Sequence, residues 1–136
     1  MKIDIGMVES SGGAQVKNHC VGAVMGAFVG DSIGSFLEFR PVSKCGRHTL
    51  TDINKALLMP GGGVHKVAPG QITDDSEMAL CMLHALTEQT NKKKPETFHR
   101  NFLCKWYGKW ARSAPFDIGG TTRNAVFKCS TTNPLY

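Results

Sequence analysis

The sequence has no Cys-x-x-Cys pair, no GxxxxGK[ST] phosphate-binding segment, and no Ser or Cys nucleophile motif near any of its five histidines. Its five cysteines are widely spaced and odd in number, so neither a zinc site nor a disulfide framework is predicted. Residues 1–13 lack the apolar segment of a secretory signal. Together these absences predict a cytoplasmic protein with reduced cysteines, and they leave the histidines without an assigned role.

A membrane span is not expected either. The apolar run within residues 20–37 is shorter than the ~18 residues that a span needs, and Asp31 interrupts it. Glycine recurs at intervals of four along the run, at Gly22, Gly26, Gly30 and Gly34. On a helix this spacing puts all four on one face, where another helix can approach closely. The run therefore predicts a buried, tightly packed helix.

Charge is only moderately unbalanced, with a net charge of +5. Part of the excess is the Lys92–Lys94 run, and no basic stripe with interleaved aromatic residues accompanies it, so no nucleic-acid partner is expected. With 41% apolar and 20% charged residues, the chain can bury a core. A length of 136 residues suits one domain, predicted over residues 20–136 after a loose leader at 1–19.

Helical periodicity predicts an all-α fold. Apolar residues recur at three and four over residues 74–87, and a stripe of aromatic residues follows Pro95 over residues 96–111. A last helix is expected from Thr121 toward Cys129. Residues 41–70 are rich in breakers and predict loops. Within them, the Gly61–Gly63 triplet is typical of a mobile loop, or alternatively of a close approach to phosphate.

The sharpest chemical feature is Thr73-Asp74-Asp75 at a predicted helix start. Three consecutive oxygen ligands suit a hard cation such as Mg²⁺ or Mn²⁺. Acidic residues at this position also stabilise a helix without any metal, through the helix dipole. The segment alone therefore leaves both interpretations open.

Two further carboxylates are candidates. Glu38 lies between Leu37 and Phe39, where a less polar pocket would raise its proton affinity and suit a base, although a surface glutamate fits the same spacing. Asp117 precedes the last predicted helix and suits contact with a guanidinium or a sugar hydroxyl. An aspartate at that position can equally cap a turn.

Four segments occur in the order of one known family. They are Gly26-Ala-Phe-Val-Gly-Asp-Ser-Ile-Gly34, Glu38-Phe39, Gly70-Gln-Ile-Thr-Asp-Asp-Ser-Glu-Met-Ala79 and Phe116-Asp-Ile-Gly-Gly-Thr-Thr-Arg123. On these segments, residues 20–126 resemble the ADP-ribosylglycohydrolases, a family that includes dinitrogenase-reductase-activating glycohydrolase and the J1 crystallins. The resemblance implies the N-terminal portion of a helical fold with a two-metal centre of Mg²⁺ or Mn²⁺. It also implies hydrolysis of the bond that joins ADP-ribose to an acceptor side chain.

By that resemblance Thr73, Asp74 and Asp75 are metal ligands, and Glu38 lies beside the metal-bound water. Asp117 faces the substrate, and its Phe-Asp-Ile-Gly segment is most similar to members that act on ADP-ribosyl-arginine. Paired cations would orient ribose hydroxyls, polarise a water and offset charge as the glycosidic bond breaks. The expected ligand or partner is therefore ADP-ribose or an ADP-ribosylated protein.

The family's Asn-Gly-x-x-Met-Arg and Asp-x-Asp-Thr motifs do not occur in the sequence. We therefore expect a truncated member whose metal shell is half present. One hypothesis is a hydrolase that needs the other half to act, and the alternative is a non-catalytic, crystallin-like structural or ADP-ribose-binding relative. If absent helices normally cover this part, apolar side chains such as Trp106 and Trp110 would be exposed and the chain would self-associate.

Overall fold

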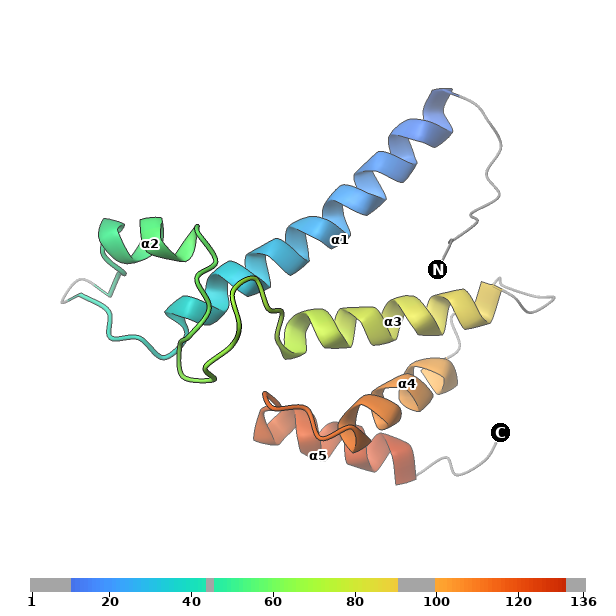
Figure 1. Ribbon diagram of the computed structural model, residues 1–136. Helices are drawn as coiled ribbons and strands as arrows, with labels where there is room; N and C mark the ends of the chain where they lie inside the picture. The colour runs from blue at the N-terminus through green and yellow to red at the C-terminus, as the bar shows by residue number, and fades with distance from the viewer. Residues whose placement is uncertain (1–10, 44–45, 91–99, 132–136) are drawn as a thin grey trace.

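The computed structural model describes residues 11–43, 46–90 and 100–131 (Figure 1). Within these ranges the chain forms five α-helices and no β-strand, which confirms the all-α prediction. The helices are α1 (Ser11–Leu37), α2 (Leu50–Ala56), α3 (Asp74–Thr90), α4 (Arg100–Arg112) and α5 (Gly120–Thr131). Lys92–Lys94 and residues 96–99 of the third predicted helix lie outside the described residues.

The first helix is longer than the sequence pattern indicated. α1 begins at Ser11 rather than at Cys20, so residues 11–19 of the expected leader are helical. The stretch Gly13–Leu37, 25 residues with a mean hydropathy of 1.5, is long and apolar enough to cross a membrane by length and composition. The helix is therefore not too short for a span, contrary to the prediction from residues 20–37. Core helices and N-terminal signal sequences pass the same test, and α1 packs against α2 and α3.

The glycine face of α1 has no neighbour among the described residues. A Cβ atom built on Gly22, Gly26, Gly30 or Gly34 would meet nothing within 4 Å. Val16, Val21 and Met25 are each 54% exposed on the same helix. Figure 1 shows the N-terminal half of α1 projecting beyond the other helices. The prediction of a tightly packed glycine face is therefore wrong for the part of the chain that the structure describes.

Helix α2 lies within the segment predicted to be loops. Its start is capped by Thr49, whose side chain accepts a 3.1 Å hydrogen bond from the backbone N–H of Asp52. The Thr49 hydroxyl in turn donates to Asp52 Oδ2 at 2.6 Å. This Thr-x-x-Asp pattern was the available signal for a helix start, and the breakers around it concealed it.

The core forms where α3, α4 and α5 pack together. Cys81, Trp110 and Val126 are buried there, and Met78, Trp106, Tyr107, Ala111 and Ile118 pack against them. Trp110 is only 7% exposed, and its indole N–H donates to Glu77 Oε2 at 2.6 Å. The expectation of exposure is therefore wrong for Trp110, whereas Trp106 is half-buried, and self-association stays a prediction. Large apolar side chains are exposed outside this core, among them Val16, Val21, Met25, Leu58 and Met82.

The cysteines differ in state. Cys20 and Cys81 carry free thiols. Cys104 is disulfide-bonded, so the expectation of reduced cysteines is wrong at this position. The cytoplasmic localisation derived from the cysteines stays a prediction.

Candidate functional site

The start of α3 is held by a carboxylate from α1. Asp31 Oδ2 accepts the backbone N–H of Thr73 at 2.8 Å and the backbone N–H of Ser76 at 3.3 Å. The hydroxyl groups of Thr73 and Ser76 also donate to Asp31. Burial raises the pKa of Asp31, but the hydrogen bonds from Ser76 and Thr73 together outweigh it, so the pKa is lowered. The ionised carboxylate therefore fixes where the Thr73–Asp75 segment lies.

This arrangement leaves oxygen lone pairs available at the helix start. Because Thr73 gives its hydroxyl hydrogen to Asp31, its hydroxyl oxygen retains lone pairs for another partner. Asp74 is half-buried, and its pKa is raised by burial and by the negative charges of Asp117, Asp75 and Glu38. Carboxylates that repel one another in this way are stabilised by a cation. The donor set of Thr73, Asp74 and Asp75 therefore fits a hard divalent ion.

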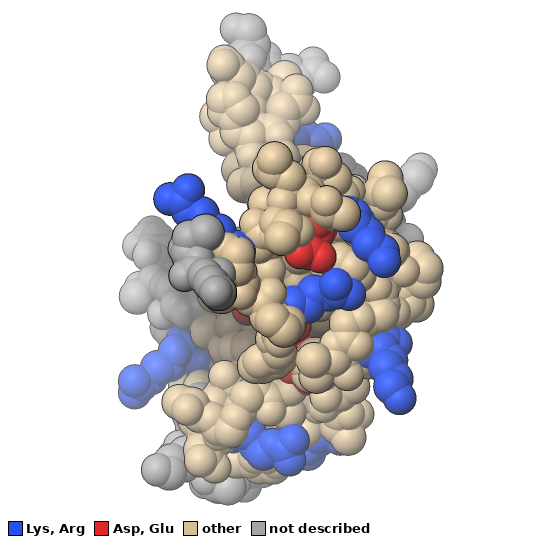
Figure 2. Space-filling view, turned by 90° about the vertical axis from the view of Figure 1, so that its left-hand side faces the viewer, with Lys and Arg blue, Asp and Glu red and all other residues tan. Residues whose placement is uncertain are grey.

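A pocket of about 710 Å³ lies between the C-terminal end of α1 and the start of α3. Its lining contains four of the residues singled out from the sequence: Glu38, Thr73, Asp74 and Asp75. Arg40 and His48 also line it. In a view turned from that of Figure 1, Lys and Arg side chains are scattered over the face, and acidic side chains are visible near its centre (Figure 2).

Glu38 lies directly after the last residue of α1. Its backbone N–H still bonds to the carbonyl of Gly34 at 3.0 Å, so the helix fixes its backbone. Burial raises the pKa of Glu38, and the negative charge of Asp117 raises it further. A raised pKa is the direction that the sequence predicted for Glu38 from its neighbours Leu37 and Phe39. The next residue, Phe39, has a positive φ of 55° and is 75% exposed.

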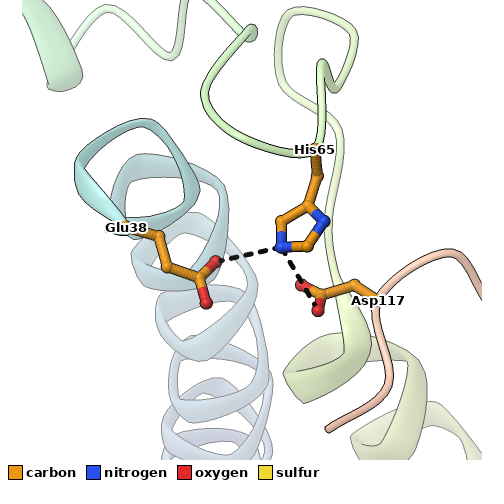
Figure 3. A group of neighbouring side chains, drawn as sticks. All are labelled: Glu38, His65 and Asp117. Atoms are coloured by element: carbon orange, nitrogen blue, oxygen red, sulfur yellow. Dashed lines mark ion pairs between the residues drawn. The ribbon is translucent and has the colours of Figure 1, made fainter. Parts of the chain in front are cut away.

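His65, which had no role assigned from the sequence, lies between Asp117 and Glu38. His65 Nε2 lies 3.4 Å from Asp117 Oδ1 and 3.9 Å from Glu38 Oε2 (Figure 3). The three residues come from the end of α1, the loop before α3 and the loop before α5. One ligand atom from each lies within 4.8 Å of the others, so this group can also hold a metal ion.

The structure thus places the predicted residues in one region but does not test their roles. Thr73, Asp74, Asp75 and Glu38 share a pocket, and Asp117 joins them through His65. Sequence reasoning missed Asp31 and His65. An aspartate within an apolar helix was one available signal, because a carboxylate there needs hydrogen-bond partners. The glycines at positions 61–63 were the available signal for His65, because they indicated a close approach of the backbone.

Comparison with known proteins identifies the family. The model of the ADP-ribosylglycohydrolase family matches residues 13–134. The chain is 38% identical to ADP-ribosylarginine hydrolase Tri1 of Serratia proteamaculans over 77% of its own length, and 36% identical to the Pseudomonas putida protein of that name over 82%. It is 31% identical to the ADP-ribosyl-[dinitrogen reductase] glycohydrolase of Rhodospirillum rubrum over 84% of its length.

The matched region is a limited part of each relative. The chain spans 26%, 28% and 35% of the lengths of these three proteins. The family's four segments all lie within the matched residues, and the structure brings the residues they contribute to one pocket and its edge. The chain belongs to the ADP-ribosylglycohydrolase family.

Proposed function

We propose that this chain carries part of a metal-dependent site that hydrolyses ADP-ribosyl linkages on arginine. The observation that supports this most is the pocket that gathers Glu38 with Thr73, Asp74 and Asp75 from two helix ends. The relatives named as ADP-ribosylarginine hydrolases support the class of linkage. The chain spans 26% and 28% of the lengths of those relatives. Hydrolysis by the whole protein is therefore proposed together with the roles of the site residues.

In this proposal Thr73, Asp74 and Asp75 hold Mg²⁺ or Mn²⁺. Both ions prefer carboxylate and hydroxyl oxygens, which are the donors that this segment presents. When bound, such an ion supplies positive charge that orients ribose hydroxyls and polarises water. Asp31 supports the ligands by fixing the backbone and hydroxyl of Thr73.

Glu38 acts as the base. A carboxylate whose pKa is raised holds a proton more readily, and burial and Asp117 raise the pKa of Glu38. Glu38 takes a proton from the attacking water as the water oxygen bonds to the anomeric carbon of the ribose. The bond from that carbon to the acceptor nitrogen breaks, and the nitrogen leaves with the bonding electrons and gains the proton that Glu38 took from the water.

Asp117 binds the acceptor. Its side chain is only 15% exposed and already pairs with the imidazole of His65. A carboxylate in this position suits the planar, cationic guanidinium of arginine, which donates two parallel hydrogen bonds to one carboxylate. A hydroxyl acceptor such as serine would lack the charge that Asp117 complements.

The test is release of ADP-ribose from ADP-ribosyl-arginine by the purified chain with Mn²⁺ or Mg²⁺. With the rest of the family's fold supplied by a longer chain or a partner, as the hydrolase hypothesis requires, we expect release, a large loss in Glu38→Gln, and no loss in Glu88→Gln, which removes a carboxylate outside the pocket. Release that survives Glu38→Gln would contradict the assigned base. A folded chain that binds ADP-ribose without releasing it from arginine would support the alternative, a non-catalytic binding relative.

A further inference from the structure

The loop that carries His65 is fixed by close backbone contacts. Gly62 and Val67 form an isolated antiparallel bridge, with N···O distances of 2.7 and 3.0 Å. A Cβ atom on Gly61 would lie 2.5 Å from the carbonyl oxygen of Val67, and one on Gly63 would lie 2.7 Å from the carbonyl oxygen of Ser35. Only glycine allows these approaches. The Gly61–Gly63 triplet therefore lies close to the backbone of α1 and of the segment that begins at Val67.

The imidazole ring of His65 is enclosed by two aromatic side chains. Its centroid lies 6.4 Å from that of Phe39 and 5.9 Å from that of Phe116, each edge to face at 63°. These residues adjoin Glu38 and Asp117 in the sequence. The His65 side chain is 22% exposed, and its Nε2 atom is buried without a hydrogen bond from the described residues. The ring is therefore held so that Nε2 faces the two carboxylates (Figure 3).

The helices that adjoin the two carboxylates do not bring them together by packing. Among the described helices, α1 and α5 do not pack on each other. Glu38 and Asp117 carry like charges, which repel. His65 Nε2 lies between them, 3.4 Å from Asp117 Oδ1 and 3.9 Å from Glu38 Oε2, so an imidazole that carries hydrogen on Nε2 offsets that repulsion and connects the end of α1 to the loop before α5.

We propose that His65 is a positioning residue that sets the separation of Glu38 and Asp117 and thereby the fit of a guanidinium acceptor. This rests on the proposed function, in which Glu38 is the base and Asp117 binds the acceptor. His65 does not enter the bond-breaking step. It keeps Asp117 at the distance from Glu38 at which an arginine nitrogen bound by Asp117 has its ribose bond beside the base.

The first test needs no activity. Long-range ¹H–¹⁵N correlation spectra of the metal-free chain report which imidazole nitrogen carries hydrogen. We expect a protonated Nε2 in His65, with a resonance that shifts in Glu38→Gln and in Asp117→Asn but not in Glu88→Gln. An unprotonated Nε2, or a resonance that neither variant moves, would overturn the proposal. Coordination of added Zn²⁺ or Mn²⁺ by an unprotonated Nε2 would replace it with a metal-ligand role.

The second test separates positioning from general stability. Calorimetry with Mn²⁺ present gives the affinities for ADP-ribosyl-arginine and for ADP-ribose. We expect His65→Ala to weaken binding of ADP-ribosyl-arginine about tenfold or more while binding of ADP-ribose changes little, because losing a well-placed hydrogen bond to a charged group changes an affinity by about this factor. His65→Gln, which keeps an N–H donor, should recover most of the difference. His84→Ala removes an imidazole that stacks on Trp106 and should change neither affinity.

Equal weakening for both ligands, or no recovery in His65→Gln, would overturn the positioning role. If the wild type binds neither ligand, the proposed function fails while the spectra still decide whether His65 joins the two carboxylates. The two failures are therefore distinguishable.

Discussion

Thr73 donates its backbone N–H to Asp31 Oδ2 over 2.8 Å, although the two residues lie 42 positions apart in the sequence. Asp31 stands near the end of α1, and Thr73 immediately precedes α3. Through this contact, the helix that leads to Glu38 also orients the proposed metal ligands. The base and the ligands are thus parts of one arrangement that depends on a single carboxylate.

Replacing that carboxylate should destabilise the fold. Asp31→Asn keeps one acceptor oxygen, while its amide nitrogen cannot accept from Thr73 or Ser76, so at least one donor loses its partner. We expect the free energy of unfolding to fall by roughly 1–3 kcal/mol, the range for leaving such groups unpaired. Urea denaturation measures this. Asp75→Asn, an exposed aspartate at the same helix start, is the matched control and should change stability less.

The same carboxylate should give stability a definite pH dependence. The pKa of Asp31 is lowered from 3.8 in the folded chain, so above 3.8 its stabilising effect is fully present. As pH falls below that value, the unfolded chain binds the proton first and the effect is lost. Glu38 and Asp74 have raised pKa values and act in the opposite direction, because the folded chain binds their protons first.

Comparing wild type with Asp31→Asn isolates the Asp31 contribution. The difference in unfolding free energy between them should be constant near neutral pH and should shrink as pH falls below 3.8. Chemical denaturation at a series of pH values measures it. A difference that grows on acidification would mean that the hydrogen bonds do not favour the ionised form.

Two glycines allow a matched test of the loop anchor. Gly63 and Gly70 have similar positive φ values of 67° and 70°, so alanine is strained at both. Only at Gly63 would the new Cβ meet backbone, 2.7 Å from Ser35 O, whereas at Gly70 it meets nothing within 4 Å. We expect Gly63→Ala to lower the thermal midpoint more than Gly70→Ala and to move the His65 imidazole resonances. Equal effects would show that the contact with Ser35 does not anchor the loop.

The sequence predicted those parts of the molecule that depend on local pattern. The periodicity of residues 74–87 locates α3, and the motif order identifies Glu38, Thr73, Asp74, Asp75 and Asp117 as candidates. The start of α1 was missed because residues 11–19 are mostly polar and residues 14–19 are exposed, so the segment lacks the apolar spacing of a packed helix.

The contacts between residues far apart in the sequence could not be predicted from local sequence patterns. Asp31 meets Thr73 and Ser76, which lie 42 and 45 residues away, and no spacing rule connects positions so distant. His65 acquires its place from Phe39 and Phe116, which belong to two other segments. Its surroundings exist only in the folded chain, where Gly63 lies close to the backbone of Ser35.

The most direct test of the account is a calorimetric titration of the folded chain with Mn²⁺ in the presence of ADP-ribose. In the proposed site, Thr73, Asp74 and Asp75 hold a divalent cation in the pocket that contains Glu38. We expect saturable binding that the Asp74→Ala/Asp75→Ala double variant abolishes and that Glu88→Gln retains. Circular dichroism confirms that each variant is folded. Unchanged binding in the double variant, or no binding by the folded wild type, would contradict the claim.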